Sequence, residues 1–206
     1  MASILSSSSD GTVQNMSTSS FAEARDATSG SRASGTRTTV NFGQGHTSGR
    51  VGERWLIQRM FLDFDTSGIS VEPTAATLNI TGTILGTADY FVVKGTQDGV
   101  GGTELNTDDF DAIDGWSNSG VDNEGNVTKY SAESGSWNTS GNNAITLTAA
   151  ALSDMVSLDT LKVCLLTNKD LRYDDLSVGE QIVNVGFMSE EGEEGAIGSS
   201  AGGKVP

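Results

Sequence analysis

The stretch RMFLDFDTSGI at residues 59–69, with ATLNIT at residues 76–81, decides the fold of this chain. In the second segment Ala76, Leu78 and Ile80 alternate with polar residues, so the apolar side chains share one face of an extended strand. A period of two with one apolar face is typical of an antiparallel strand that has one side in a core and one in water. The polar break between the segments predicts a turn between two strands.

The same periodicity predicts further strands along the chain. They cover residues 12–16, 38–42, 55–64, 90–94, 144–148, 161–166 and 181–188. One helix of about two turns is predicted where Leu152, Met155 and Val156 share a helical stripe. Many short strands with a single short helix predict an all-β, jelly-roll-like antiparallel β-sandwich. An immunoglobulin-like sandwich is the alternative, although the Cys…Trp…Cys pattern of that fold is absent.

Composition divides the chain into three parts. Residues 1–50 are rich in Ser, Thr and Gly, and we expect a flexible polar arm that contains weak strands. The alternative is an arm that becomes ordered against an acidic neighbouring subunit. Residues 51–191 form the predicted sandwich, with a long polar loop insertion at 98–143. Residues 192–206 are rich in Gly, Ser and Glu, and we expect a loose tail.

The net charge of −15 and the pI of about 4.2 exclude several classes of partner. A polyanion repels phosphate backbones and anionic lipids, so we expect no binding to nucleic acid or membranes. No segment has the roughly 18 apolar residues of a membrane span, and residues 1–6 lack the features of a secretory signal. We therefore expect a protein that is made in the cytoplasm and assembled there.

Groups suited to catalysis are scarce. The single cysteine, Cys164, lies in an apolar run, which favours a buried and inert thiol. The single histidine, His46, lies in a stretch that reads as a polar loop, where we expect it to be solvated. One histidine and one cysteine exclude a typical zinc site. The sequence therefore predicts a protein that is not an enzyme and has no cofactor, apart from a structural Ca²⁺ ion.

The candidate Ca²⁺ ligands are closely spaced carboxylates in the insertion: Asp109, Asp111 and Asp114. Carboxylate oxygens are hard ligands that suit Ca²⁺. The spacing departs from the EF-hand pattern, because Ile113 occupies a ligand position of that loop. Solvated acidic loop residues are the alternative interpretation.

The second candidate site is aromatic. The same insertion contains three aromatic residues, Trp116, Tyr130 and Trp137. They could form a platform on which a cell-surface glycan stacks. The alternative is a cluster that pins the insertion to the sheet.

The residues FLDFDTSGI at 61–69, AATLNI at 75–80, ITLTAAAL at 145–152 and FMSEE at 187–191 resemble a recurrent pattern. This pattern is similar to the core of β-sandwich domains related to the DNRLRE type. Such domains occur on bacterial surface proteins, and similar modules occur among bacteriophage structural proteins. The matching residues build the fold, so the resemblance implies a β-sandwich and no particular site.

These observations favour a non-enzymatic structural protein of a bacteriophage virion, such as a capsid decoration, head fibre or tail appendage. We expect a homo-oligomer that contacts other virion proteins. The alternative function is a carbohydrate-binding or adhesin module.

Overall fold

The computed structural model describes residues 2–6, 10–35, 39–50, 52–98, 105–187 and 195–199. The strands are β1 (Ala2–Leu5), β2 (Gly11–Ser17), β3 (Arg32–Ser34), β4 (Thr39–Gly49), β5 (Gly52–Asp65), β6 (Ala76–Gly86), β7 (Tyr90–Lys94), β8 (Asn142–Thr146), β9 (Thr160–Thr167), β10 (Gln181–Phe187) and β11 (Gly195–Ser199). The helices are α1 (Phe21–Arg25), the 3₁₀ helix η1 (Thr107–Asp111), α2 (Ala149–Ser157) and α3 (Asn168–Leu171).

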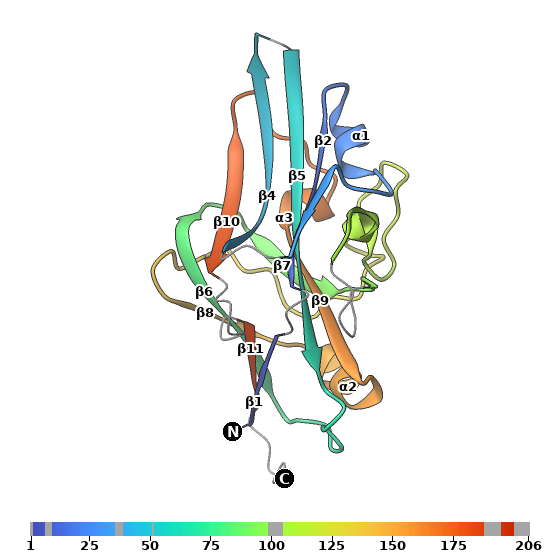
Figure 1. The fold of residues 1–206 in the computed structure, drawn as a ribbon, viewed down its shortest axis with the longest axis vertical. Coiled ribbons are helices and arrows are strands. Elements are labelled where there is room, and N and C mark those ends of the chain that lie inside the picture. Colours follow the sequence, from blue (N-terminus) through green and yellow to red (C-terminus); the bar gives the residue numbers. More distant parts are fainter. Residues whose placement is uncertain are drawn as a thin grey trace.

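Every strand ladder in the described residues is antiparallel, and the strands form one open sheet in the order β1-β11-β6-β10-β4-β5-β2-β3. β9 joins the sheet at the C-terminal half of β5, and β7 pairs with β9. β6 carries β8 and β11 and also pairs with β10, so it links the two layers of a sandwich (Figure 1). The prediction of an all-β antiparallel sandwich is confirmed.

The inner core lies between these two layers. Met60, Leu62 and Phe64 of β5 contribute to it, and they face Leu78 and Ile80 of β6. The predicted alternation in β6 is therefore confirmed, because its apolar face is buried. Helix α2 closes one end of this core through Ala151, Leu152 and Met155, in agreement with the predicted helix.

An outer core covers the opposite face of β5, β7 and β9. Phe61, Phe91 and Cys164 enter it from these strands, while Phe21 comes from α1 and Phe110 from η1. The insertion thus covers a sheet face and also follows the edge of β7 through backbone hydrogen bonds. Residues 90–93 of β7 and 163–166 of β9 are buried on both faces, so these stretches show no polar face in the sequence.

The prediction of a flexible N-terminal arm is wrong for the described residues. β2 and β4 both pair with β5, and β4 is longer than the weak strand expected there. A polar composition does not mean that this region is flexible, because its polar side chains can have partners inside the fold. Thr12 Oγ1, for example, donates to Asn41 O at 3.0 Å. Gly43 reads as part of a loop but lies in β4, where a Cβ would come within 2.5 Å of Ile182 O.

Other predictions differ in detail. α1 and α3 were not predicted, because each spans only about one turn. Residues 195–199, expected to be part of a loose tail, form β11 between β1 and β6. The rest of that tail and residues 188–191 of the FMSEE motif lie outside the described residues. None of the described helices is both long enough and apolar enough to cross a membrane.

The bend of β6 contains a strained residue that generates a prediction. Between Gly82 and Gly86 the register with β10 shifts, and Ile84 has a φ of 62° with 74% of its surface exposed. A β-branched residue is strained in this conformation, whereas asparagine tolerates it.

We expect Ile84→Asn to raise the free energy of unfolding by about 1 kcal/mol, measured by urea denaturation. Val71→Asn is the matched control, since Val71 is 72% exposed and has no positive φ. Equal effects of the two changes on stability would contradict strain at Ile84.

Candidate functional site

Asp109, the first predicted Ca²⁺ ligand, is a buried structural residue. Its carboxylate accepts hydrogen bonds from Asn106 N at 2.8 Å and Asp98 N at 2.9 Å. Together with the Asn106 side chain it forms a capping box at the start of η1. Its oxygens therefore fix the beginning of the insertion.

Asp111 and Asp114 point to separate partners. Asp111 Oδ2 accepts from Asn118 Nδ2 at 2.6 Å, and Asp114 Oδ2 accepts from Thr128 Oγ1 at 2.7 Å. In the described part of the chain, no group of three or more His, Cys, Asp or Glu side chains is arranged to hold a metal ion. The structure therefore does not bring Asp109, Asp111 and Asp114 together as a site.

The predicted glycan platform is corrected in the same way. Tyr130 is fully buried and Trp137 is 7% exposed, both in the inner core. Trp137 packs edge-on against Phe42 and Tyr90, with ring centroids 5.4 Å apart in each pair. Trp116 instead packs against the outer core. The three side chains pin the insertion to the sheet, which was the alternative interpretation, and they form no exposed stacking surface.

Trp116 covers the most unusual feature of the structure, a pair of fully buried arginines. The guanidinium carbons of Arg25 and Arg59 lie 4.3 Å and 4.1 Å from the Trp116 ring centroid. Arg59 also lies 4.2 Å from the ring of Phe110. Because aromatic faces are electronegative, these contacts stabilise the buried cations.

Asp170 neutralises Arg59 through a bidentate ion pair. Arg59 Nε donates to Oδ2 at 2.8 Å and Nη2 donates to Oδ1 at 3.0 Å. Arg59 Nη1 donates to Phe110 O at 2.8 Å, which ties η1 to β5. Arg25 Nε donates to Asp170 O at 2.9 Å, and Arg25 Nη1 pairs with Asp26. This network was not predicted from the sequence, although an arginine within an apolar strand indicates that a buried acid must pair with it.

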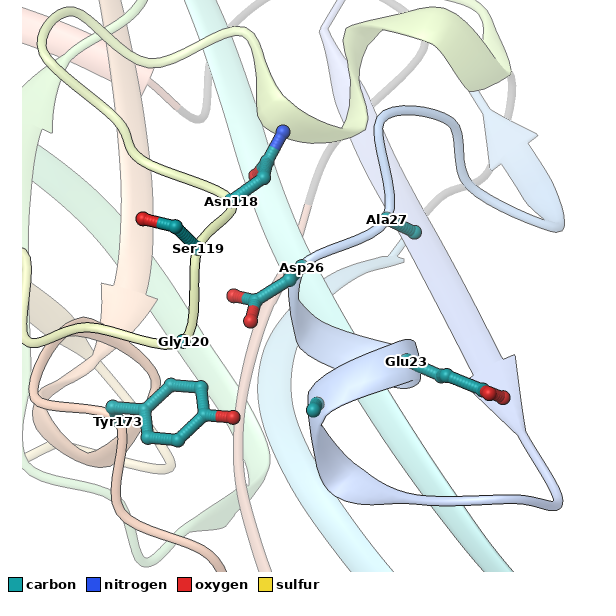
Figure 2. A pocket seen from close by; sticks show the side chains of 8 residues that line it. Glu23, Asp26, Ala27, Asn118, Ser119, Gly120 and Tyr173 are labelled. Atoms are coloured by element: carbon teal, nitrogen blue, oxygen red, sulfur yellow. The ribbon is translucent and has the colours of Figure 1, made fainter.

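Beside this network lies an open hollow of about 540 Å³ between α1 and the loop at 118–120 (Figure 2). It is lined by Ala22, Glu23, Asp26, Ala27, Asn118, Ser119, Gly120 and Tyr173. In Figure 2 the Asp26 carboxylate and the Tyr173 hydroxyl point into the hollow, while Glu23 points away from it. Asp26, the carboxylate that points into the hollow, already pairs with Arg25 Nη1.

The two residues with the most reactive side chains are also part of the fold. Cys164 is buried as predicted, and burial raises the pKa of its thiol, so it stays protonated. The prediction that His46 is solvated is wrong. His46 lies in β4, is only 6% exposed and stacks on Trp55, with ring centroids 4.4 Å apart. Its Nδ1 lies 2.7 Å from Leu176 O, so this nitrogen carries the proton that bonds the carbonyl.

Asp10 is a buried acid whose pKa is strongly raised. The residue is 1% exposed, and its Oδ1 accepts from Asp63 N at 2.9 Å. Desolvation raises the pKa of Asp10 from 3.8 to about 7, with a smaller contribution from the charge of Asp63.

Comparison with known proteins assigns no function: no protein-family model matches this chain, and no curated protein matches it.

The buried ion pair generates a stability prediction. We expect Asp170→Asn to lower the free energy of unfolding by about 3–5 kcal/mol, because it leaves the Arg59 charge buried and uncompensated. Glu124→Gln, which disrupts partly exposed ion pairs with Arg172 and Lys129, should cost about 1 kcal/mol or less. Urea denaturation measures both, and a similar small loss for both variants would show that Asp170 is not needed for neutralisation.

Asp10 generates a pH prediction. Its pKa is higher in the folded state than in the unfolded state, so folding retains a proton between about pH 4 and 7. The stabilisation is present at low pH and is lost as the pH rises through 7, by roughly 2–4 kcal/mol relative to Asp10→Asn. The difference in unfolding free energy between the two proteins should therefore change across this window and stay constant above it. A constant difference from pH 4 to 8 would contradict the raised pKa.

Proposed function

We propose that this protein is a non-enzymatic structural component of a bacteriophage virion, and that it acts through contacts with other copies of itself and with other virion proteins. Support comes from the sandwich fold, from the resemblance to modules of phage structural proteins, and from how reactive side chains are used. Arg59, Asp170, His46 and Cys164 all serve packing or internal pairing. The observation that carries the proposal is the projecting tip of the β4–β5 hairpin.

This hairpin tip, residues 47–50 and 52–54, extends beyond its neighbours. β10 pairs with β4 only as far as Gly45, and β2 pairs with β5 only as far as Trp55. Beyond these points the described residues of β4 and β5 pair only with each other and are exposed on both faces. The hairpin stands clear of the other strands at the top of Figure 1. A two-stranded ribbon is marginally stable alone, and its free edges can pair with another chain.

The base of the hairpin is rigid. His46 stacks on Trp55, and Trp55 Nε1 donates to Asp175 Oδ2 at 3.1 Å. The backbone of His46 bonds to Glu180 and Gly179. The tip is therefore held in a fixed direction, which reduces the entropy lost when it binds a partner.

The hairpin tip also differs in charge from the rest of the chain. Arg50 and Arg54 are exposed, and in the part of the chain that the structure describes no ion pair engages them. The whole chain carries a charge of −15. The described part of the tip also contains the exposed acid Glu53, so two arginines and one glutamate give it a net charge of +1. This positive tip is complementary to the acidic surface of a second copy, which favours a homo-oligomer.

Sedimentation velocity tests this role of the hairpin tip. At low ionic strength we expect the protein to form oligomers that dissociate as salt screens the charges. Arg54→Glu should weaken association at least tenfold. Arg32→Glu, an equal charge change at an exposed residue of β3, should have little effect. A monomer under all conditions, or equal effects of both changes, would contradict association through the tip.

The location in a virion has its own test. Peptide mass spectrometry of purified phage particles should find this chain in a fixed ratio to the major capsid or tail proteins. Its absence from particles, with the chain present only in infected-cell extract, would contradict the proposal.

A further inference from the structure

The open hollow beside α1 contains a tyrosine hydroxyl that the fold does not use. The chain has three tyrosines, and two of them bond inside the structure. Tyr130 donates to the carboxylate of Asp154. Tyr90 shares a side-chain hydrogen bond with Ser134. The hydroxyl of Tyr173 has no hydrogen-bond partner among the described residues and points into the hollow (Figure 2).

Asp26 also keeps one carboxylate oxygen available on the same side of the hollow. Its Oδ1 accepts from Arg25 Nη1 at 2.6 Å, whereas no hydrogen bond in the described part of the chain engages Oδ2. The backbone N–H and C=O groups of Ser119 and Gly120 likewise have no partner among the residues that the structure describes. Hydrogen-bond donors and acceptors therefore line one open space, as in small-molecule sites.

Gly120 brings these groups close to one point. A Cβ at Gly120 would lie 3.3 Å from Tyr173 Oη and 3.9 Å from Asp26 Oδ2. The backbone of Gly120 has a φ of 70°, which residues with a side chain rarely adopt. A ligand atom beside Gly120 can therefore reach both the hydroxyl and the carboxylate.

Buried neighbours hold the Tyr173 ring in place. The guanidinium carbon of the fully buried Arg25 lies 5.0 Å from its centroid, and Phe21 packs edge-on against it at 5.2 Å. Tyr173 has a φ of 62°, which is a strained conformation for a bulky residue. Strained backbone concentrates at ligand sites, where it positions a side chain before the ligand arrives.

The charges around the hollow favour a neutral ligand. The Asp26 charge is matched by Arg25, and the Glu23 side chain points away from the hollow in Figure 2, so little negative charge is left to attract a cation. The whole chain carries a charge of −15, which repels an anion.

We propose that this hollow binds a neutral saccharide, with one sugar ring held between Tyr173, Gly120 and Asp26. Sugar hydroxyls both donate and accept hydrogen bonds, so they match the available carboxylate oxygen, the tyrosine hydroxyl and the backbone groups. The volume of about 540 Å³ lies within the range of small-molecule sites. This site is distinct from the aromatic platform predicted from the sequence, and it does not depend on the proposed virion role.

Saturation-transfer difference NMR on the full chain tests the site. The neutral probes are galactose, mannose, fucose, N-acetylglucosamine and lactose, and the charged probes are N-acetylneuraminic acid and L-arginine amide. We expect transfer to at least one neutral sugar with a dissociation constant of about 1 mM, because a small ligand with few contacts binds weakly. The two charged probes should show no transfer.

Variants locate the sugar in the hollow. Tyr173→Phe removes one hydroxyl but keeps the ring that packs on Phe21, so it should weaken sugar binding about fivefold. Gly120→Ala places a methyl group at the centre of the site and should weaken binding roughly tenfold or more. Gly179→Ala is the matched control, because Gly179 also has a positive φ, of 89°, but has nothing within 4 Å of its Cβ position. It should leave sugar binding intact.

Three results would overturn the proposal. The first is the absence of transfer to every neutral sugar. The second is equal sugar binding by the wild type, Tyr173→Phe and Gly120→Ala, which would place the sugar elsewhere on the surface. The third is a preference for L-arginine amide that both variants abolish, which would make the hollow a site for a cation.

Discussion

The buried ion pair between Arg59 and Asp170 is the constraint on which the rest of the structure depends. A guanidinium in the middle of a long apolar strand cannot be left without a counter-charge, because the interior offers no water to solvate it. α3 supplies the carboxylate, while Phe110 O and Arg25 O each accept one further hydrogen bond from the guanidinium. One side chain of β5 therefore fixes α3, η1 and the end of α1 against the same face of the sheet.

This constraint explains why polar segments are ordered. The insertion and the N-terminal region look mobile by composition, yet both provide partners that the buried charges require. Phe110 and Trp116 cover the Arg59 guanidinium, and Arg25 enters from α1. The outer core around them buries Phe21, which would otherwise be exposed. A polar segment is thus retained on the sheet by a few buried side chains, and its average composition says little about its order.

The parts of the fold that depend on local patterns can be predicted from the sequence. The alternation of β6, the two-sided burial of β7 and the stripe of α2 can all be seen in neighbouring residues. β2 and β4 were predicted only as weak strands of a flexible arm. The partners of their polar side chains and glycines lie far away in the sequence, as with Thr12 and Asn41. The sequence also did not predict that the insertion covers the outer face of the sheet, because no local pattern shows which face a loop packs on.

The candidate sites were harder to predict than the fold. Carboxylate spacing suggested Asp109, Asp111 and Asp114, but the neighbouring amides that bind each carboxylate become visible only in the folded chain. Arg25, Arg59 and Asp170 show the opposite case, because no spacing in the sequence indicates that they meet.

Among the described residues, many charged and aromatic groups pair within the fold, and the hairpin tip is the exposed element best suited to contacts. Hydrogen–deuterium exchange, compared between assembled and salt-dissociated protein, tests this account most directly. The account predicts that assembly slows exchange at residues 47–50 and 52–54 and at one acidic surface, while the amides around Arg59 stay protected in both states. Equal exchange of the hairpin tip in both states, or protection that depends on assembly around Arg59, would contradict it.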